Sequence, residues 1–311
     1  MFHDFISKSF FYSLRLLTVI LGVVTLVFLL IHFIPGDPVE VMLGEIAQTA
    51  DKQALRLALG LEQPLWQQWL TYIQHLFQGD LGQSLHSKVP ITEVLAQRLP
   101  ATIQLATVSL IVAILIAVPL GCLAAIKHNT WLDQGAMAFS LLGMSIPNFW
   151  LGPLFILFFS LQLGWFPVSG REHLLSLVLP ALTLGTALAA ILARMIRSAL
   201  LEILNEDYIR TARAKGLSEF AILYHHALRN AALPVITIIG LQLGTLLGGA
   251  VITETIFSWP GIGQLLIESI QKRDYPVVQA CVLIVSLAYV GVNAITDSLY
   301  AVLDPRIRLS D

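Results

Sequence analysis

The sequence predicts an all-α integral membrane protein with six transmembrane helices and a long extracytoplasmic loop after the first helix. Only 12% of the 311 residues are charged, about half the share found in soluble domains, and the mean hydropathy is +0.77. Six windows are apolar over the roughly 20 residues that a helix needs to cross a bilayer. They are Leu14–Ile34, Ile103–Ile126, Met137–Leu163, Leu177–Ala199, Leu233–Ile256 and Val277–Leu303.

The N-terminus, the cysteines and the net charge narrow the class of protein further. The first window should remain as a membrane helix, because its apolar run exceeds the roughly 7–15 residues of a signal peptide and no small-x-small cleavage site follows. Cys122 and Cys281 each stand inside an apolar run, so we expect buried thiols rather than a disulfide framework. A net charge of −2 argues against nucleic acid as a partner.

Basic residues near the helix ends predict that both termini are cytoplasmic. With this orientation the cytoplasmic side holds Lys8, Arg15, Lys127, Arg194, Arg197, Arg210, Arg213, Lys215, Arg229, Arg306 and Arg308. The outer side holds fewer: Lys52, Arg56, Lys88, Arg98, Arg171, Lys272 and Arg273. The first four of these lie in the long outer loop, where the rule counts less.

The windows divide the chain into four parts. Residues 1–34 form the N-terminal tail and first helix, 35–99 an extracytoplasmic segment, 100–303 a five-helix core that includes the polar segment 200–232, and 304–311 a cytoplasmic tail. The outer segment begins with a turn at Pro35–Pro38 and should hold a short helix, Asp51–Leu61, with Gly60 near its end. The aromatic residues that follow favour packing at the membrane interface over a substrate-binding box: Trp66, Trp69, Tyr72 and Phe77.

The polar segment 200–232, called the insert below, is longer than a turn between two spans requires. Asn205–Lys215 can form a helix in which Glu206 and Arg210 stand four apart, in the favourable order for an ion pair. The insert therefore begins with a short helix that exposes cations.

End signals in the insert predict a second helix. Gly216 suits the position after a helix end, and Ser218 suits an N-cap with Glu219 in the first turn. This helix should run to about Asn230, before Pro234 begins the next span. We expect two short helices lying at the membrane surface.

Two interpretations fit the insert. Its cations could touch anionic lipid as a positive-inside loop. Alternatively another protein docks on it, and the small face formed by Ile209, Ala212 and Gly216 would allow a close approach. The small face and the internal stop at Gly216 favour docking.

The segment Ala212-Arg-Ala-Lys-Gly-Leu-Ser218, followed by His226-Ala-Leu-Arg-Asn230, resembles the cytoplasmic coupling loop of permease subunits of binding-protein-dependent ABC importers. That loop's general pattern is Glu-Ala-Ala, three residues, Gly, nine residues, Ile, one residue, Leu-Pro. Aligned on Gly216, only Ala212, Gly216 and Leu228 keep it. The sequence of these two segments is similar to the form found in the branch that carries peptides, nickel and glutathione.

Further motifs resemble this branch and follow its order from end to end. They are Pro35-Gly-Asp-Pro38, Leu59-Gly-Leu-Glu-Gln-Pro64, Gly79-Asp-Leu-Gly82, Ser145-Ile-Pro-Asn-Phe149, Trp259-Pro-Gly-Ile-Gly263, Arg273-Asp-Tyr-Pro276 and Leu303-Asp-Pro-Arg-Ile-Arg308. Each motif alone is weak, whereas the ordered set is specific.

The resemblance implies a type I ABC importer permease fold in the bacterial inner membrane, forming the translocation path. It implies as partners a second similar permease, two cytoplasmic ATPase subunits, an extracytoplasmic substrate-binding protein and membrane lipid. ATP and Mg²⁺ would bind to the ATPases, because this chain has no Gly-x4-Gly-Lys-Ser/Thr phosphate loop; we expect no cofactor in it and no enzyme activity. The implied coupling residues are Arg210, Thr211, Ala212, Arg213, Lys215, Gly216, Ser218, His226, Leu228 and Arg229.

Prolines in or near the windows should kink or break the spans at Pro119, Pro147 and Pro153. At the second of these, a simple kink is one explanation. The other is that Ser145, Pro147 and Asn148 expose backbone to the translocation path, where irregular structure is tolerated.

Other residues of the core have two interpretations each. Asp297 makes a structural hydrogen bond or takes part in transport, Arg194 and Arg197 extend to the inner interface, where they could also face the insert, and Glu254 and Glu268 are solvated or contact the binding protein. A small face spaced by four serves contact with the partner permease or packing within this subunit: Gly240, Gly244 and Gly248.

Two other classes of protein fit less well. An ion-gradient-driven secondary transporter should show paired intramembrane acids and inverted repeats, whereas only Asp297 qualifies and no repeat is visible. A membrane enzyme or scaffold would need a polar catalytic cluster at one membrane face, and none is visible in the sequence. Within the branch, peptides are the preferred substrate and nickel or glutathione the alternatives, because the spans hold no cluster of metal ligands. The adjacent His225 and His226 lack the i, i+4 spacing of a metal site.

Overall fold

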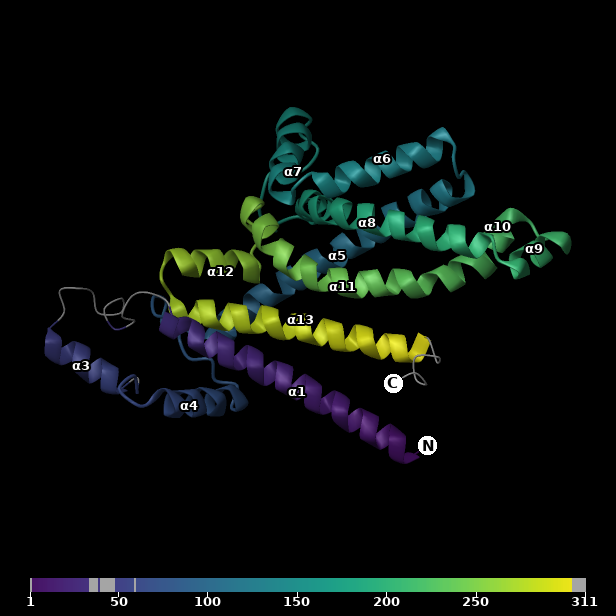
Figure 1. The fold of residues 1–311 in the computed structure, drawn as a ribbon. Helices are drawn as coiled ribbons and strands as arrows, with labels where there is room; N and C mark the ends of the chain where they lie inside the picture. The colour runs from purple at the N-terminus through teal and green to yellow at the C-terminus, as the bar shows by residue number, and fades with distance from the viewer. Residues whose placement is uncertain (1, 34–38, 40–47, 59, 304–311) are drawn as a thin grey trace. The chain divides into compact units, whose positions relative to one another are not determined.

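The computed structural model describes residues 2–33, 39, 48–58 and 60–303, and Figure 1 labels its helices along the chain. The turn predicted at Pro35–Pro38 and the tail 304–311 lie outside these residues. Within them the α-helices are α1 (Phe2–Phe33), α3 (Thr49–Ala58), α4 (Leu65–Phe77), α5 (Ile91–Ile126), α6 (Trp131–Ser145), α7 (Asn148–Phe155), α8 (Val178–Leu204), α9 (Asp207–Ala214), α10 (Glu219–Ala221), α11 (Leu228–Ile256), α12 (Ile262–Gln271) and α13 (Tyr275–Leu303). Two π-helical segments, η1 (Ile156–Gln162) and η3 (Ile222–Ala227), and a 3-10 turn, η2 (Leu174–Leu177), complete the described helices.

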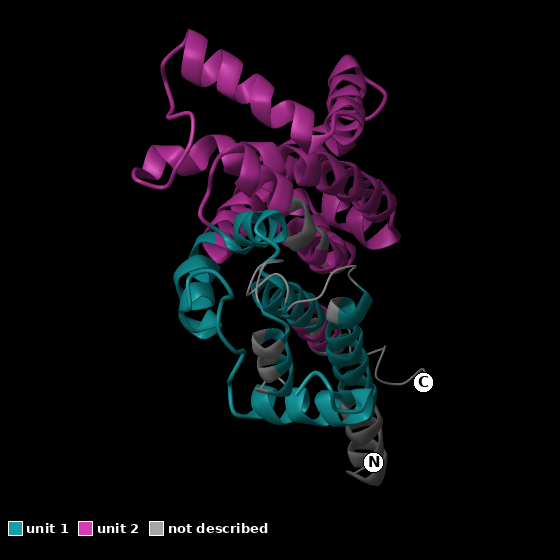
Figure 2. Ribbon diagram, turned by 90° about the vertical axis from the view of Figure 1, so that its left-hand side faces the viewer, with its two compact units in different colours: residues 1–101, 261–290 teal, residues 102–260, 291–311 magenta. Residues whose placement is uncertain are grey.

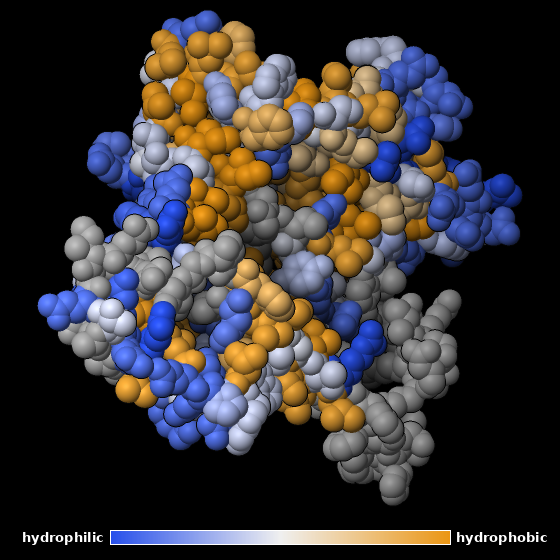
Figure 3. All heavy atoms as spheres, turned by 60° about the vertical axis from the view of Figure 1, so that its left-hand side comes forward, coloured by the Kyte–Doolittle hydropathy of each residue, from blue (hydrophilic) through white to orange (hydrophobic). Residues whose placement is uncertain are grey.

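Three helices are long and apolar enough to cross a membrane: Ile91–Ile126, Leu174–Leu204 and Tyr275–Ser298. Two bent pairs pass the same test, Trp131–Ser145 with Asn148–Gln162 and Glu219–Ala232 with Pro234–Gly244. The described residues thus contain three to five candidate spans, which lie at the last five predicted windows. The first window falls on α1, whose apolar part is the shorter stretch Leu14–Leu30, so a sixth span stays a prediction. Figure 3 shows broad apolar areas on one face of the surface, as lipid contact requires.

Proline has different effects at the predicted break points. The helix α5 runs through Pro119, and α7 contains Pro153. At Pro147, in contrast, the chain turns by 103° between α6 and α7, far more than a kink of about 20°. Ile146 is extended there (φ −85°, ψ 116°), in line with the restriction that a proline places on the residue before it.

The chain divides into two compact units, which Figure 2 distinguishes by colour. The first comprises residues 1–101 and 261–290. The predicted outer helix is α3, with Gly60 at φ +66° just beyond it. Two of the aromatic residues pack inside this unit: Trp69 Nε1 donates to Thr25 Oγ1 at 3.2 Å, and the Tyr72 ring lies 5.7 Å from that of Phe28. The core joins the start of α5 to α12 and α13 through Ile91, Leu95, Ile262, Leu265, Val277, Ala280 and Cys281.

The second unit, residues 102–260 and 291–311, is organised around α8. Leu192 and Leu200 of this helix are completely buried. Glycine lets α5 approach it closely, because a Cβ at Gly121 would lie 2.8 Å from Ala193 O and one at Gly185 would lie 2.9 Å from Ser109 O. Both cysteines of the chain are free and buried.

Candidate functional site

The insert begins with α9, which ends where the sequence predicts. Gly216 adopts the left-handed region at φ +83°, which suits glycine because it has no Cβ. Its N–H donates to Arg213 O at 2.9 Å, and the Leu217 N–H donates to Ala212 O at 3.3 Å. These two bonds form a Schellman motif, which satisfies the free carbonyl groups at the helix end.

The second helix of the insert begins as predicted but does not end as predicted. The Ser218 hydroxyl caps it by accepting from Ala221 N at 3.3 Å. From there α10, η3 and α11 follow one another without an intervening loop, and Pro234 lies inside α11. A bend of 50° accommodates the proline, because a helix can remain continuous by kinking where proline removes a backbone donor. The predicted stop at Asn230 is therefore wrong.

The small face of α9 points inward. Ile209 is fully buried and Ala212 is 7% exposed, and both pack with Ile222 against Ile203 and Leu204. An amphipathic helix buries its apolar stripe in this way. Because residues of the same chain cover this face, it is not the open docking face that the sequence predicts. Of the three residues predicted to form this face, only Gly216 is exposed.

Aromatic side chains, which the sequence reasoning did not use, form the exposed apolar part of the insert. Phe220 is 75% exposed and Tyr224 is 62% exposed, and their rings stack with centroids 6.3 Å apart. Their i, i+4 spacing is the signal that could have identified this pair. Tyr208 is also exposed, and its hydroxyl accepts from Asn230 Nδ2 at 2.8 Å. The cations of the predicted coupling set are exposed as expected: Arg210, Arg213, Lys215 and Arg229.

Two ion pairs lie within the insert. Arg213 Nε donates to Glu219 Oε1 at 2.7 Å across the Gly216 turn, and this hydrogen bond raises the pKa of Arg213. Arg210 pairs with Asp207 at 3.3 Å rather than with Glu206, which is the extended N-cap residue of α9. Because the Arg210 pair is highly exposed, its effect on stability is small.

A third ion pair lies close to the insert, at the start of α6. Arg197 of α8 donates to both carboxylate oxygens of buried Asp133, with Nε–Oδ1 at 2.5 Å and a second bond of 2.8 Å to Oδ2. His128 Nδ1 and the Asn129 N–H each lie 3.0 Å from Oδ2. Arg197 is thus paired within the protein with 21% of its side chain exposed, whereas Arg194 is exposed. That both side chains extend to the inner interface stays a prediction.

A cavity of about 240 Å³ lies between these two groups of charges. Its lining includes His128 from the α5–α6 turn, Asn205 from the end of α8, and both members of the Arg213–Glu219 pair. The α5–α6 turn, the end of α8 and the insert therefore meet at one place.

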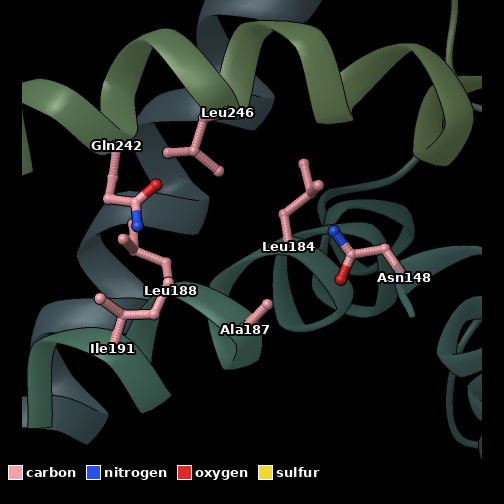
Figure 4. Close-up of a pocket in the computed structure, with 7 residues that line it drawn as sticks. All are labelled: Asn148, Leu184, Ala187, Leu188, Ile191, Gln242 and Leu246. Atoms are coloured by element: carbon pink, nitrogen blue, oxygen red, sulfur yellow. The ribbon is translucent and has the colours of Figure 1, made fainter. Parts of the chain in front are cut away.

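Another cavity, of about 200 Å³, lies where α7, α8 and α11 meet. Figure 4 shows the amide of Asn148 at one side and that of Gln242 at the other, with leucines between them. The complete lining is Asn148, Leu184, Ala187, Leu188, Ile191, Gln242 and Leu246. Of the predicted path residues only Asn148 belongs to it; the Ser145 hydroxyl instead donates to Leu141 O at 2.7 Å within α6.

Gly240, Gly244 and Gly248 form a row of glycines on α11, and the first of them packs within this subunit. A Cβ at Gly240 would collide with the Thr296 side chain of α13. Gly244 is buried, and the surroundings of Gly248 are not among those described.

The three carboxylates of the core for which the sequence allows two roles differ in their environments. Glu254 is fully buried and accepts from Thr102 Oγ1 at 2.6 Å, so contact between Glu254 and a binding protein is excluded in this structure. Glu268 pairs with Arg98 at 3.7 Å. Asp297 is exposed on α13.

Comparison with known proteins identifies the class. Residues 117–309 match the family described as binding-protein-dependent transport system inner membrane component, and residues 4–106 match the N-terminal family of these membrane components. The chain belongs to this family: it is a multi-pass inner membrane permease subunit of an ABC transporter, which is not itself catalytic. Such a component implies a partner ATPase and a partner binding protein.

Relatives align over nearly the whole chain. The dipeptide transport system permease protein DppB of Escherichia coli (strain K12) is 44% identical, covering 93% of this chain and 94% of the relative. The di/tripeptide transport system permease protein DppB of Pseudomonas aeruginosa (strain UCBPP-PA14) is 47% identical, covering 92% and 94%. The glutathione transport system permease protein GsiC of Salmonella choleraesuis (strain SC-B67) is 45% identical, covering 95% and 96%.

Solved structures share the fold. A chain of the MetNI methionine ABC transporter in inward-facing conformations superposes with a TM-score of 0.60 at 22% identity, covering 68% of this chain and 97% of that one. An amino acid ABC transporter solved with histidines gives a TM-score of 0.51 at 15% identity, covering 69% and 94%. The described helices therefore have the fold of ABC importer permeases.

Proposed function

We propose that this chain is one of two similar permease subunits of an ATP-driven importer that brings short peptides across the inner membrane. The observation that carries the proposal is 44–47% identity to dipeptide and di/tripeptide permeases over nearly the whole chain. The proposal includes six spans of the type I fold, both termini in the cytoplasm, and an extracytoplasmic segment at 35–99.

The insert is proposed to contact one of two ATPase subunits. Its support is a turn fixed by Gly216 and the Arg213–Glu219 pair, next to exposed aromatic and cationic side chains. Exposed aromatic residues and arginine are the side chains that contribute most to protein interfaces. Without this contact the chain could still insert into the membrane, but ATP hydrolysis would no longer drive transport through it.

The cavity at Asn148 and Gln242 is the proposed part of the translocation path. Its apolar walls carry two uncharged amides, which can donate to and accept from the peptide groups of a substrate. Glutathione is the second candidate substrate, because one relative at 45% identity is a glutathione permease. Nickel remains a third.

The test is reconstitution of the complete importer in proteoliposomes, with its partner permease, ATPases and binding protein. Uptake of a labelled dipeptide is expected to require ATP, with excess glutathione and Ni²⁺ compared as competitors. Uptake driven by an ion gradient without ATP would overturn the transport mechanism. ATP-dependent uptake of Ni²⁺ but of no peptide would overturn the substrate.

A further inference from the structure

Two turns of the first unit are joined by one buried carboxylate. Asp274, which is 4% exposed, accepts from Ser84 Oγ at 2.5 Å and from Leu85 N at 3.1 Å. A second connection lies beside the first, because His86 Nε2 donates to Lys272 O at 2.5 Å. The segment Gln83–Pro90 before α5 and the segment Gln271–Asp274 before α13 are thus held as one surface, called the double turn below.

The double turn carries exposed cations. Lys88, Lys272 and Arg273 are all exposed, as is His86. Within the described residues none of the three cations forms an ion pair. Asp274 is turned inward to its hydrogen bonds, and the nearby Glu268 is paired with Arg98. The outward-facing charge of the double turn is therefore positive.

Two of these cations stand where the backbone disfavours them. Lys88 has φ +58° and Arg273 has φ +56°, a left-handed conformation that is unfavourable for a residue with a Cβ and that glycine adopts freely. Folding alone would favour glycine or asparagine at both turns. The chain instead places a long basic side chain at each, on a rigid frame.

We propose that the double turn is a docking surface for an acidic patch on the extracytoplasmic binding protein. The inference rests on the proposed function, which places residues 35–99 on the extracytoplasmic side of the membrane, and on the predicted orientation, which places Lys272 and Arg273 on the same side. It adds the surface and the charge by which the binding protein is recognised. The hydrogen bonds of Asp274 and His86 fix the backbone from which these side chains extend, so their spacing suits a partner with its own fixed surface. Attraction to anionic lipid depends on charge and needs no fixed spacing.

The backbone geometry supplies a sharp experiment. In the triple variant Lys88→Gly, Lys272→Gln and Arg273→Gly, three charges are removed while both left-handed positions receive the residue that suits them. The variant is therefore expected to fold at least as well as the wild type. The matched control is Asn129→Gly, which makes the same backbone change at φ +59° without removing a charge.

The complete importer is placed in nanodiscs of phosphatidylcholine, and binding of its purified binding protein is measured over a range of salt. The triple variant is expected to bind about tenfold more weakly at low salt, mainly through slower association. The difference should disappear near 1 M salt, where the screening length is about 3 Å. The control should bind as the wild type does.

Three results would overturn the inference while leaving the proposed function intact. One is equal binding by the triple variant and the wild type at low salt. Another is a loss of binding that salt does not change. The third is a difference that occurs only when phosphatidylglycerol is added to the nanodiscs, which would assign the double turn to lipid. If the wild-type importer neither binds a binding protein nor takes up peptide, the proposed function itself fails.

Discussion

Asp133 in the first turn of α6 forms a bidentate ion pair with Arg197 of α8. Arg197 lies only a few residues before the insert in the sequence. The Asp133 side chain is 5% exposed and that of Arg197 is 21% exposed. Such a pair is hard to break from one side, because the remaining charge stays partly buried.

Asp133→Asn should therefore destabilise the protein by about 2 kcal/mol. The expected loss is smaller than the roughly 3–5 kcal/mol for fully buried pairs, because Arg197 retains access to water. Thermal unfolding of the purified complex measures it. The double variant Asp133→Asn with Arg197→Met should recover part of the loss. If Asp133→Asn were as stable as the wild type, the ion pair would not contribute to the stability of the protein.

Gly216→Pro should abolish association with the ATPase while the chain still inserts into the membrane. Proline holds φ near −65° and has no N–H, whereas Gly216 has φ +83° and donates to Arg213 O. Co-purification of the ATPase measures the effect. Gly135→Ala is the control, because nothing lies within 4 Å of its added Cβ. Normal peptide uptake by Gly216→Pro would contradict the role of the turn.

Phe220→Ala with Tyr224→Ala should weaken ATPase binding by at least about thirtyfold, since truncating an interface hot spot costs about 2 kcal/mol or more. Both side chains are exposed, so the fold should be unaffected. Phe77→Ala, which removes an 89% exposed ring from α4, is the matched control. Equal ATPase affinity in the double variant and the control would remove these aromatics from the interface.

Gly240→Ala should destabilise the packing of α11 on α13 by about 1–3 kcal/mol, the usual range for overpacking. The added methyl group would meet the Thr296 side chain. Thr296→Ala in the same chain should restore part of the loss, and unfolding of all four proteins measures this coupling. If Gly240→Ala is stable but fails to pair with the second permease, the glycine row serves assembly instead.

Asn148→Leu should slow peptide uptake about fivefold, the equivalent of one hydrogen bond of roughly 1 kcal/mol. The rate of ATP hydrolysis should change little, because Asn148 lies in the cavity of α7, α8 and α11 and not at the insert. Gln162→Leu, which alters an exposed amide outside the cavity, is the control. A parallel fall in uptake and ATP hydrolysis would argue against a path role.

The parts of this structure that the sequence predicted are those set by neighbouring residues. Gly216 and Ser218 carry their turn and cap signals within three residues, and Pro147 acts on Ile146 beside it. The parts that it did not predict depend on distant partners. Arg197 meets Asp133 across 64 positions, and Glu254 meets Thr102 across 152.

The prediction that the small face of α9 is open for docking was wrong for the same reason. The pattern of Ile209 and Ala212 defines a face correctly, but only the position of Ile222 shows that this face is covered. The continuity through Pro234 depends on packing around a bend, which a rule that proline ends helices does not include.

The helical segments α10, η3 and α11 follow one another without a break, so the second half of the insert is a direct extension of α11. No loop interrupts the chain between Phe220 and the part of α11 beyond Pro234. If the proposed ATPase contact moves the exposed end, we expect the helix to carry that displacement as far as Pro234, where the 50° bend is the expected pivot.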